Sequence, residues 1–205
     1  SVSETTEGVH IHIIDAELMG KGEKEKKDLY IEGVQNNGII NHYEYIINSE
    51  GTIEIRHVLK PEGKMPLWFP RIGLTLTVSD ALDQVKWYGR GPQENYPDRK
   101  TGYPTGIYAS TVQAMYEPYL MPQDYGLRTD VRWLQLTTDK GIGLQFKMNE
   151  WFNFNIYPYS TDNLTKAMYT YQLQKQKGMT LNLDYATTGV GCTARGVFGA
   201  YKAMP

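Results

Sequence analysis

The 205-residue chain is poor in cysteine, in net charge and in long apolar runs, and each shortage excludes a class of protein. Its single cysteine, Cys192, excludes an intramolecular disulfide and a zinc centre built from several thiolates. A formal net charge of −2, from 21 basic and 23 acidic side chains, gives no field of one sign for nucleic acid or an anionic membrane. No apolar stretch approaches the roughly 20 residues that span a bilayer. We therefore expect neither a nucleic-acid partner nor a membrane partner.

Motifs for nucleotide binding and for common hydrolytic enzymes are also missing. The chain contains no G-x-x-x-x-G-K-[ST], no G-x-G-x-x-G, no H-E-x-x-H and no G-x-S-x-G. Its four histidines lie in the N-terminal third of the chain, and His10 and His12 share one face of an expected strand. A metal site there needs a third ligand from elsewhere, so we interpret both as polar-face side chains. We expect no metal site and no cofactor in this chain.

What the sequence does contain is a period of two. Apolar residues alternate with polar ones in five segments, which are 9–13, 72–78, 142–148, 152–156 and 179–185. This alternation is typical of strands that have one face on a core and the other toward water or polar neighbours. We therefore expect strands in all five segments.

Turn signals separate the strand-like segments. Triplets that end in glycine lie at 36–38, 49–51, 61–63 and 139–141. The first three fall between strand-like segments and predict hairpin loops. Many short strands with turns between them favour a large antiparallel sandwich.

Two further segments depart from the alternation. Ser160 is a candidate N-cap for a short helix. Leu164, Met168 and Tyr171 follow at spacings of four and three, which are helical spacings. Residues 92–122 are rich in Gly, Pro and Tyr and show little alternation, and an irregular stretch of this length is often functional.

The best-placed acidic side chains for chemistry are Glu94 and Asp98, within 91–99. A glycosidase uses two carboxylates that face each other across the scissile bond. The neighbouring Arg90 and Arg99 favour ionised carboxylates, whereas a catalytic acid must hold a proton. We therefore expect Glu94 and Asp98 to accept backbone N–H groups and to pair with Arg90 or Arg99, which would hold an irregular loop on the sheet.

The stretch 87–99, WYGRGPQENYPDR, closely resembles the signature stretch in the C-terminal domain of the large, multidomain β-galactosidases of glycoside hydrolase family 2. Further blocks resemble that family in the right order, at 71–74, 116–128, 158–164 and 181–191. The resemblance extends over residues 8–200, and the nine consecutive residues 91–99 make it highly specific.

The resemblance implies an all-β fold, a large antiparallel β-supersandwich similar to galactose mutarotase. Residues 1–205 are then a single domain, the C-terminal fragment of a longer β-galactosidase that hydrolyses terminal β-D-galactosides. Such a domain packs against a catalytic (β/α)8 barrel that supplies the catalytic glutamates, so we expect no catalytic residue in this chain and no activity from it alone. The parent's magnesium and sodium sites belong mostly to the barrel, and the parent is expected to be a homo-oligomer.

In this family the C-terminal domain helps to wall the sugar pocket, and one aromatic residue that follows a Gly-x-Gly motif stacks on the sugar. The chain departs from that pattern, because no tryptophan follows 189–191 and Arg195 is the nearest large side chain. An arginine can bind sugar hydroxyls by hydrogen bonds rather than stacking. We expect the substrate-binding residues to be Arg195, Glu94, Tyr96, Asp98 and Arg99.

Two alternatives remain open. Exposed tyrosine and tryptophan side chains could form the platform of a stand-alone carbohydrate-binding module. A mutarotase-like, sugar-epimerising enzyme would instead need a histidine and a carboxylate in one cleft. No signal peptide is visible, so the compartment, cytoplasmic or periplasmic or secreted, depends on a preceding part of a longer parent.

Overall fold

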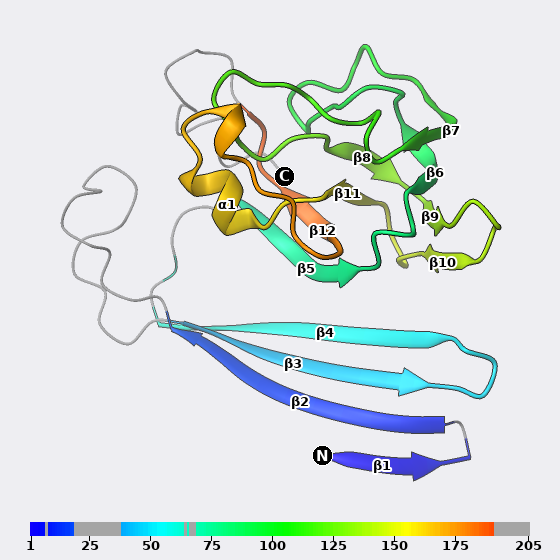
Figure 1. The fold of residues 1–205 in the computed structure, drawn as a ribbon. Coiled ribbons are helices and arrows are strands. Elements are labelled where there is room, and N and C mark those ends of the chain that lie inside the picture. The colour runs from blue at the N-terminus through cyan, green and yellow to red at the C-terminus, as the bar shows by residue number, and fades with distance from the viewer. Residues whose placement is uncertain (7, 19–37, 64, 66–68, 191–205) are drawn as a thin grey trace. The chain divides into compact units, whose positions relative to one another are not determined.

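The computed structural model describes residues 1–6, 8–18, 38–63, 65 and 69–190. The chain divides into two compact units, Ser1–Leu67 and Trp68–Pro205. Nearly all regular structure is β-strand, and the strands form three four-stranded antiparallel sheets (Figure 1). This confirms the expected all-β, antiparallel class. The prediction of a single domain with a galactose mutarotase-like fold stays a prediction.

The N-terminal unit is one sheet in which sequential strands are neighbours (Figure 1). Its strands are β1 (Val2–Thr5), β2 (Gly8–Leu18), β3 (Gly38–Ile47) and β4 (Ile53–Glu62). Directly paired residues share a face, so the register places His12 beside Glu44 and Glu44 beside Arg56. The other face carries Tyr43, whose ring stacks on His57 with 4.3 Å between the ring centroids. The strand predicted at 9–13 is confirmed within β2.

The turn predicted at 49–51 is confirmed as the β3–β4 hairpin loop. Asn48 Oδ1 accepts the backbone N–H groups of Glu50 and Thr52, both at 3.0 Å. Gly51 has φ of +82°, a left-handed conformation that a side chain would disfavour. The Asn48 side chain and the glycine together therefore fix the register in which β4 pairs with β3.

The C-terminal unit contains the other two sheets (Figure 1). One sheet has the strand order β5 (Arg71–Val78), β12 (Met179–Thr187), β11 (Phe152–Tyr157) and β8 (Arg128–Val131). The second has the order β10 (Gly143–Phe146), β9 (Trp133–Thr137), β6 (Gln84–Arg90) and β7 (Thr105–Thr111). Strands predicted at 72–78, 152–156 and 179–185 are confirmed, and the one predicted at 142–148 is shorter, as β10.

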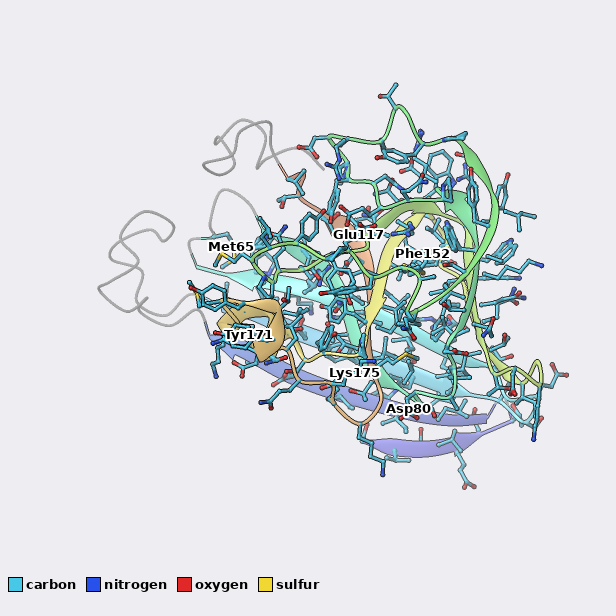
Figure 2. The ribbon with its side chains drawn as sticks, turned by 45° about the horizontal axis from the view of Figure 1, so that its top comes forward. Met65, Asp80, Glu117, Phe152, Tyr171 and Lys175 are labelled. Atoms are coloured by element: carbon cyan, nitrogen blue, oxygen red, sulfur yellow. The ribbon has the colours of Figure 1, made fainter. Side chains whose placement is uncertain are left out.

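The main hydrophobic core of the C-terminal unit joins these two sheets. Fully buried side chains come from both of them and include Val85, Trp87, Leu134, Leu136, Phe152, Phe154, Ile156 and Leu181. The rings of Trp87 and Phe154 meet edge to face, with 5.9 Å between their centroids. Figure 2 labels Phe152 within this packed region. The predicted sandwich is therefore present in this unit.

A second, tyrosine-rich layer covers the outer face of β11, so that every residue of this strand is buried. Tyr125, Tyr157 and Leu164 form the centre of the layer. Leu164 lies on α1 (Thr161–Lys166), and the predicted cap is confirmed because Ser160 Oγ accepts the Asn163 N–H at 3.0 Å. A 3-10 turn, η1 (Thr170–Gln172), follows. Neither helix, within the described part of the chain, has the length or hydropathy to cross a membrane.

Two predictions about irregular segments are wrong. Pro61 lies in β4 opposite Ile39, not in a hairpin loop, and proline is tolerated there because β4 is the edge strand of its sheet. Residues 92–122 are not wholly irregular, because they contain β7, also an edge strand. The turn at 139–141 closes the β9–β10 hairpin, whereas residues 36 and 37 lie outside the described residues.

Candidate functional site

The carboxylate of Glu94 lies at the centre of the loop 91–99 that follows β6, the signature loop, and Glu94 is only 6% exposed. Its Oε2 accepts the Gly126 N–H at 2.8 Å and the Tyr96 hydroxyl at 3.1 Å. Its Oε1 accepts the Tyr119 hydroxyl and lies 3.3 Å from a guanidinium nitrogen of Arg99. The expected pairing of Glu94 with a backbone N–H and with Arg99 is therefore confirmed.

The two tyrosines that donate to Glu94 are held in their neutral form. Burial and the neighbouring Glu94 carboxylate raise the pKa of Tyr96 far above its ordinary value. Burial and the hydrogen bond to Glu94 raise the pKa of Tyr119 to about 12. Both hydroxyls therefore keep their protons near neutral pH and remain hydrogen-bond donors, which fixes Glu94 as an acceptor within the loop.

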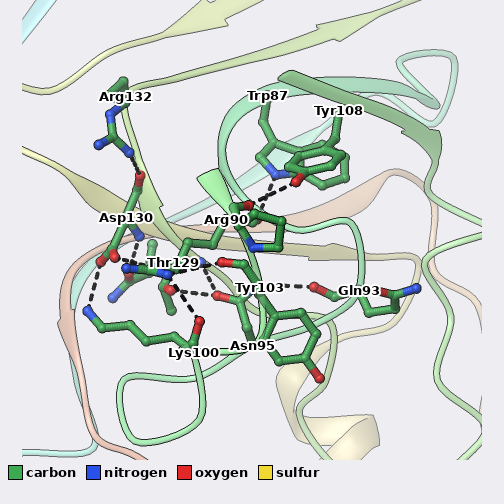
Figure 3. A network of polar contacts seen from close by, with 12 residues as sticks. Trp87, Arg90, Gln93, Asn95, Lys100, Tyr103, Tyr108, Thr129, Asp130 and Arg132 are labelled. Atoms are coloured by element: carbon green, nitrogen blue, oxygen red, sulfur yellow. Dashed lines mark hydrogen bonds and ion pairs between the residues drawn. The ribbon is translucent and has the colours of Figure 1, made fainter. Parts of the chain in front are cut away.

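Arg90 was one of the two arginines predicted to pair with Glu94 or Asp98, but it pairs with neither. Its Nε lies 2.5 Å from Asp130 Oδ2, and its Nη1 donates to the carbonyls of Lys100 and Tyr103 at 3.1 and 3.0 Å (Figure 3). Asp130 lies 40 residues from Arg90 in the sequence, at the end of β8, so local spacing gave no sign of this pair.

Asp130 carries two cationic partners, because Lys100 Nζ lies 3.0 Å from its Oδ1 (Figure 3). Burial alone raises the pKa of the Asp130 carboxyl, but the hydrogen bonds from Arg90 and Lys100 outweigh burial and hold that pKa below its ordinary value. The backbone of Asp130 has φ of +54°, in the left-handed region, and its carbonyl accepts Arg132 Nη1 at 2.6 Å. An ionised carboxylate is thus fixed in a strained backbone position, a combination that is common at functional sites.

Asn95 attaches the signature loop to β8. This completely buried residue accepts the Thr129 N–H and hydroxyl on its Oδ1, at 3.1 and 2.5 Å (Figure 3). Its own backbone N–H donates to the Leu127 carbonyl at 2.8 Å, and its Nδ2 donates to the Gln93 carbonyl at 3.0 Å. The loop is therefore held by the backbone of the strand that also carries Asp130.

Asp98 connects the signature loop with the Gly-x-Gly segment that follows β12. Its Oδ1 accepts the Val190 N–H at 3.1 Å, and a Cβ atom built on Gly189 would lie 2.2 Å from the Asp98 Cγ. Two sequence blocks that lie 92 residues apart are thus in direct contact. Arg195 lies outside the described residues, so its predicted place beside a sugar stays a prediction.

A groove of about 550 Å³ opens beside this loop. The side chains that matter most for its chemistry are Lys100, Asp130, Asn149, Glu150, Trp151, Asn153 and Tyr185. Trp151 and Tyr185 are 58% and 63% exposed, which leaves two aromatic rings at the surface beside charged and amide groups. Carbohydrate sites combine such rings with a few polar groups. The groove is therefore the best candidate functional site in the described part of the chain.

Sequence reasoning missed the groove, and Tyr185 shows why. Alternation along 179–185 grouped Tyr185 with the core residues Leu181 and Leu183, but it is exposed. A register shift between Asp184 and Ala186 leaves Tyr185 as an extra residue and turns its ring outward. Only a weak pattern indicated Trp151, which is an aromatic residue directly before the strand predicted at 152–156.

The predicted substrate-binding residues are arranged in two ways. Glu94 and Tyr96 are buried in the loop, whereas Asp98 is partly exposed and Arg99 is exposed. Their neighbours Pro97 and Lys100 line the groove. The loop therefore lines the groove with neighbours of the predicted residues, whereas Glu94, Tyr96, Asp98 and Arg99 do not themselves line it.

The groove offers little to a hard cation such as magnesium. Its two carboxylates, within the described residues, are Asp130 and Glu150, and both oxygens of Asp130 are already occupied by Arg90 and Lys100, which leaves Glu150 alone. Oxygen-rich sites for magnesium or calcium need uncommitted carboxylates and carbonyls. The expectation that the parent's magnesium and sodium are bound elsewhere stays a prediction. In the described residues, His10, His12 and Glu44 of the N-terminal unit are grouped closely enough to hold a metal ion.

Comparison with known proteins identifies relatives of the chain. Residues 5–202 match the family described as beta galactosidase small chain. A β-galactosidase from Priestia megaterium is 38% identical over 147 residues, or 72% of this chain, and one from Pseudoalteromonas haloplanktis is 34% identical over 148 residues, also 72%. A β-galactosidase from Vibrio cholerae is 39% identical over 122 residues, or 60% of this chain. The chain spans only 11–14% of the length of these relatives.

Proposed function

Because the chain belongs to the β-galactosidase small-chain family, we propose that it is the non-catalytic C-terminal domain of a longer enzyme of glycoside hydrolase family 2. In this proposal the parent hydrolyses terminal β-D-galactosides, and this domain packs on the catalytic barrel and walls the sugar pocket. The small share of each relative that the chain spans supports the proposal, because most of each relative lies outside the matched region.

The state of the carboxylates supports a role without proton transfer. Glu94 is enclosed by hydrogen-bond donors from its own loop and from the segment that contains Tyr119 and Gly126, and Asp98 accepts the Val190 N–H. Asp130 lies in the groove but is ionised and paired with two cations, so it has no proton to donate near neutral pH. A glycosidase needs one protonated and one ionised carboxyl group on opposite sides of the sugar bond. Among the described residues that line the groove, the exposed Glu150 is the only other carboxylate, and one carboxylate does not make such a pair.

The groove supports a role in sugar positioning. The exposed rings of Trp151 and Tyr185 can stack on C–H faces of a sugar, and Lys100 and Asn149 can meet its hydroxyl groups. Arg132 lies over the Trp151 ring, with its Cζ 4.2 Å from the ring centroid, so the indole is held in place before a ligand arrives. A wall of this kind orients a substrate and excludes water without taking part in bond cleavage.

Replacement of Trp151 in the full-length parent tests the proposal. We expect Trp151→Ala to raise KM for a chromogenic galactoside about tenfold or more, because a stacking contact is lost, while kcat changes less. Tyr171→Ala is the matched control, since Tyr171 is 79% exposed but lies in the 3-10 turn and does not line the groove. Unchanged KM in Trp151→Ala and Tyr185→Ala would remove the groove from the proposal.

A stand-alone carbohydrate-binding module is the second candidate, and the two exposed groove aromatics favour it. Galactose titration of the purified chain by calorimetry separates the candidates. Millimolar or tighter binding that disappears in Trp151→Ala supports the module, whereas no heat of binding supports a passive wall. A mutarotase-like enzyme has no comparable support, because the groove lining, within the described residues, includes no histidine.

A further inference from the structure

Two imidazoles and a carboxylate converge on the polar face of the N-terminal sheet. His10 and His12 lie two residues apart on β2, and Glu44 pairs with His12 from β3. His10 Nδ1 and His12 Nε2 lie 3.8 and 3.7 Å from the same atom, Glu44 Oε1. All three donor atoms lie within 4.8 Å of one another. The third ligand that the sequence could not supply is therefore present, provided by strand pairing.

The donors are too far apart to satisfy one another. Separations of 3.7 and 3.8 Å exceed the length of a hydrogen bond. The His10 side chain is only 15% exposed. Its second ring nitrogen, Nε2, which is not the one near Glu44, has no hydrogen-bond partner among the described residues. Two imidazoles and a carboxylate that approach one another this closely without hydrogen bonds between them form an arrangement that a cation can complete.

Arg56 orients the carboxylate. Its Nη1 lies 3.1 Å from Glu44 Oε2, the oxygen that faces away from the histidines, and its Nε lies 2.8 Å from Glu54. One oxygen of Glu44 is thus occupied from the β4 side, while the other is directed toward the imidazoles. Partners of this kind fix the ligand geometry of metal sites and are nearly as important as the ligands themselves.

We propose that His10, His12 and Glu44 bind a divalent transition-metal ion, with Zn²⁺ as the representative of the class. Zinc holds imidazole nitrogen and carboxylate oxygen at about 2.0–2.2 Å, so two tetrahedral ligands lie about 3.4 Å apart. The carboxylate–imidazole separations need to shorten by only a few tenths of an ångström. Two imidazoles favour zinc, copper, nickel or iron over magnesium and calcium, which prefer all-oxygen sites.

The site ties two strands together. Two ligands come from β2 and one from β3, so the bound ion stabilises the pairing of these strands in the observed register. Water completes the coordination, since His12 is 50% exposed and leaves the ion open to solvent. The proposal is independent of the sugar groove, which lies in the other unit.

Calorimetric titration of the chelator-treated chain with ZnCl₂ tests the proposal. We expect saturable binding of one ion per chain with about micromolar or tighter affinity. His12→Ala and Glu44→Gln should each weaken binding at least about tenfold, because loss of a supporting partner alone costs 10–100-fold. Arg56→Met should weaken it by roughly tenfold while leaving all three ligands in place.

His57→Gln is the matched control, since His57 lies on the opposite face of the same sheet and contacts Asn41 and Tyr43. Its affinity for Zn²⁺ should equal that of the unaltered chain. Circular dichroism identifies any variant that fails to fold, and His12→Ala is safest in this respect because His12 is half exposed. Absence of saturable binding below about 1 mM, or an equal loss in His57→Gln, would overturn the proposal.

Discussion

Replacement of Glu94 by glutamine probes the physical role of the signature loop. The change keeps the shape of the side chain but replaces one acceptor oxygen with an NH₂ donor. In the structure both oxygens face donors: Oε2 meets the Gly126 N–H and Tyr96 hydroxyl, and Oε1 meets the Tyr119 hydroxyl and Arg99. Whichever way the amide turns, its NH₂ faces groups that also donate, so at least one buried donor loses its partner.

The size of the effect follows from these contacts. Hydrogen bonds to a charged group contribute about 1.5–3 kcal/mol each, and an unsatisfied buried donor costs about 1–3 kcal/mol. The tyrosine hydroxyl can rotate to accept from the new NH₂, which recovers part of the loss. The pair with Arg99 is left out, because Arg99 is 52% exposed and solvent screens it. We therefore expect Glu94→Gln to destabilise the C-terminal unit by about 2–4 kcal/mol.

Urea unfolding followed by tryptophan fluorescence measures this change, because all four tryptophans lie in Trp68–Pro205. Glu150→Gln is the matched control: Glu150 is exposed, and its replacement should alter stability by less than about 0.5 kcal/mol. A loss below about 1 kcal/mol in Glu94→Gln would refute the assignment of Glu94 as the structural centre of the loop.

Three further predictions concern single sites. Burial raises the pKa of Asp184 to about 7, so the stability that its protonated form contributes is present below pH 4 and is lost as pH rises toward 7. Urea unfolding should show this loss, on the order of 2–4 kcal/mol, in the unaltered chain but not in Asp184→Asn. Ser160→Ala removes the acceptor of the Asn163 N–H and should lower the free energy of unfolding, measured by thermal unfolding, by about 1 kcal/mol. No change would mean that the cap does not contribute to stability. Gly189→Ala should displace Asp98 and cost about 1–2 kcal/mol, and a double-mutant cycle with Asp98→Ala should show strong coupling; additive effects would contradict the contact.

Local pattern was enough to predict much of the fold. Alternation identified the strands at 72–78, 152–156 and 179–185, because apolar residues recur at every second position over most of each strand and pack toward the core of the sandwich. The cap at Ser160 was equally local, since the acceptor and the N–H lie three residues apart. Two edge strands were harder to predict than β5, which is also at an edge. β7 buries little of either face, so its alternation is weak, and β4 contains a proline that resembles a turn signal.

The sites depend on contacts that no local window contains. Asp130 meets Arg90 across 40 residues, and Glu44 reaches His12 only because β2 and β3 pair in one register. A single bulge reverses Tyr185 from the core to the surface. Sequence alone could name the loop that borders the groove, through its family resemblance, but not the side chains that strand pairing and strand irregularity bring to it.

Hydrolysis of a chromogenic β-galactoside by the purified 205-residue chain is the decisive assay for a domain without catalytic carboxyl groups. We expect no turnover above the uncatalysed rate, because Glu94, Asp98 and Asp130 are held by hydrogen bonds and ion pairs, and Glu150 alone cannot supply the two carboxyl groups that the reaction needs. Clear turnover that disappears in Glu94→Gln, while the variant remains folded, would contradict it.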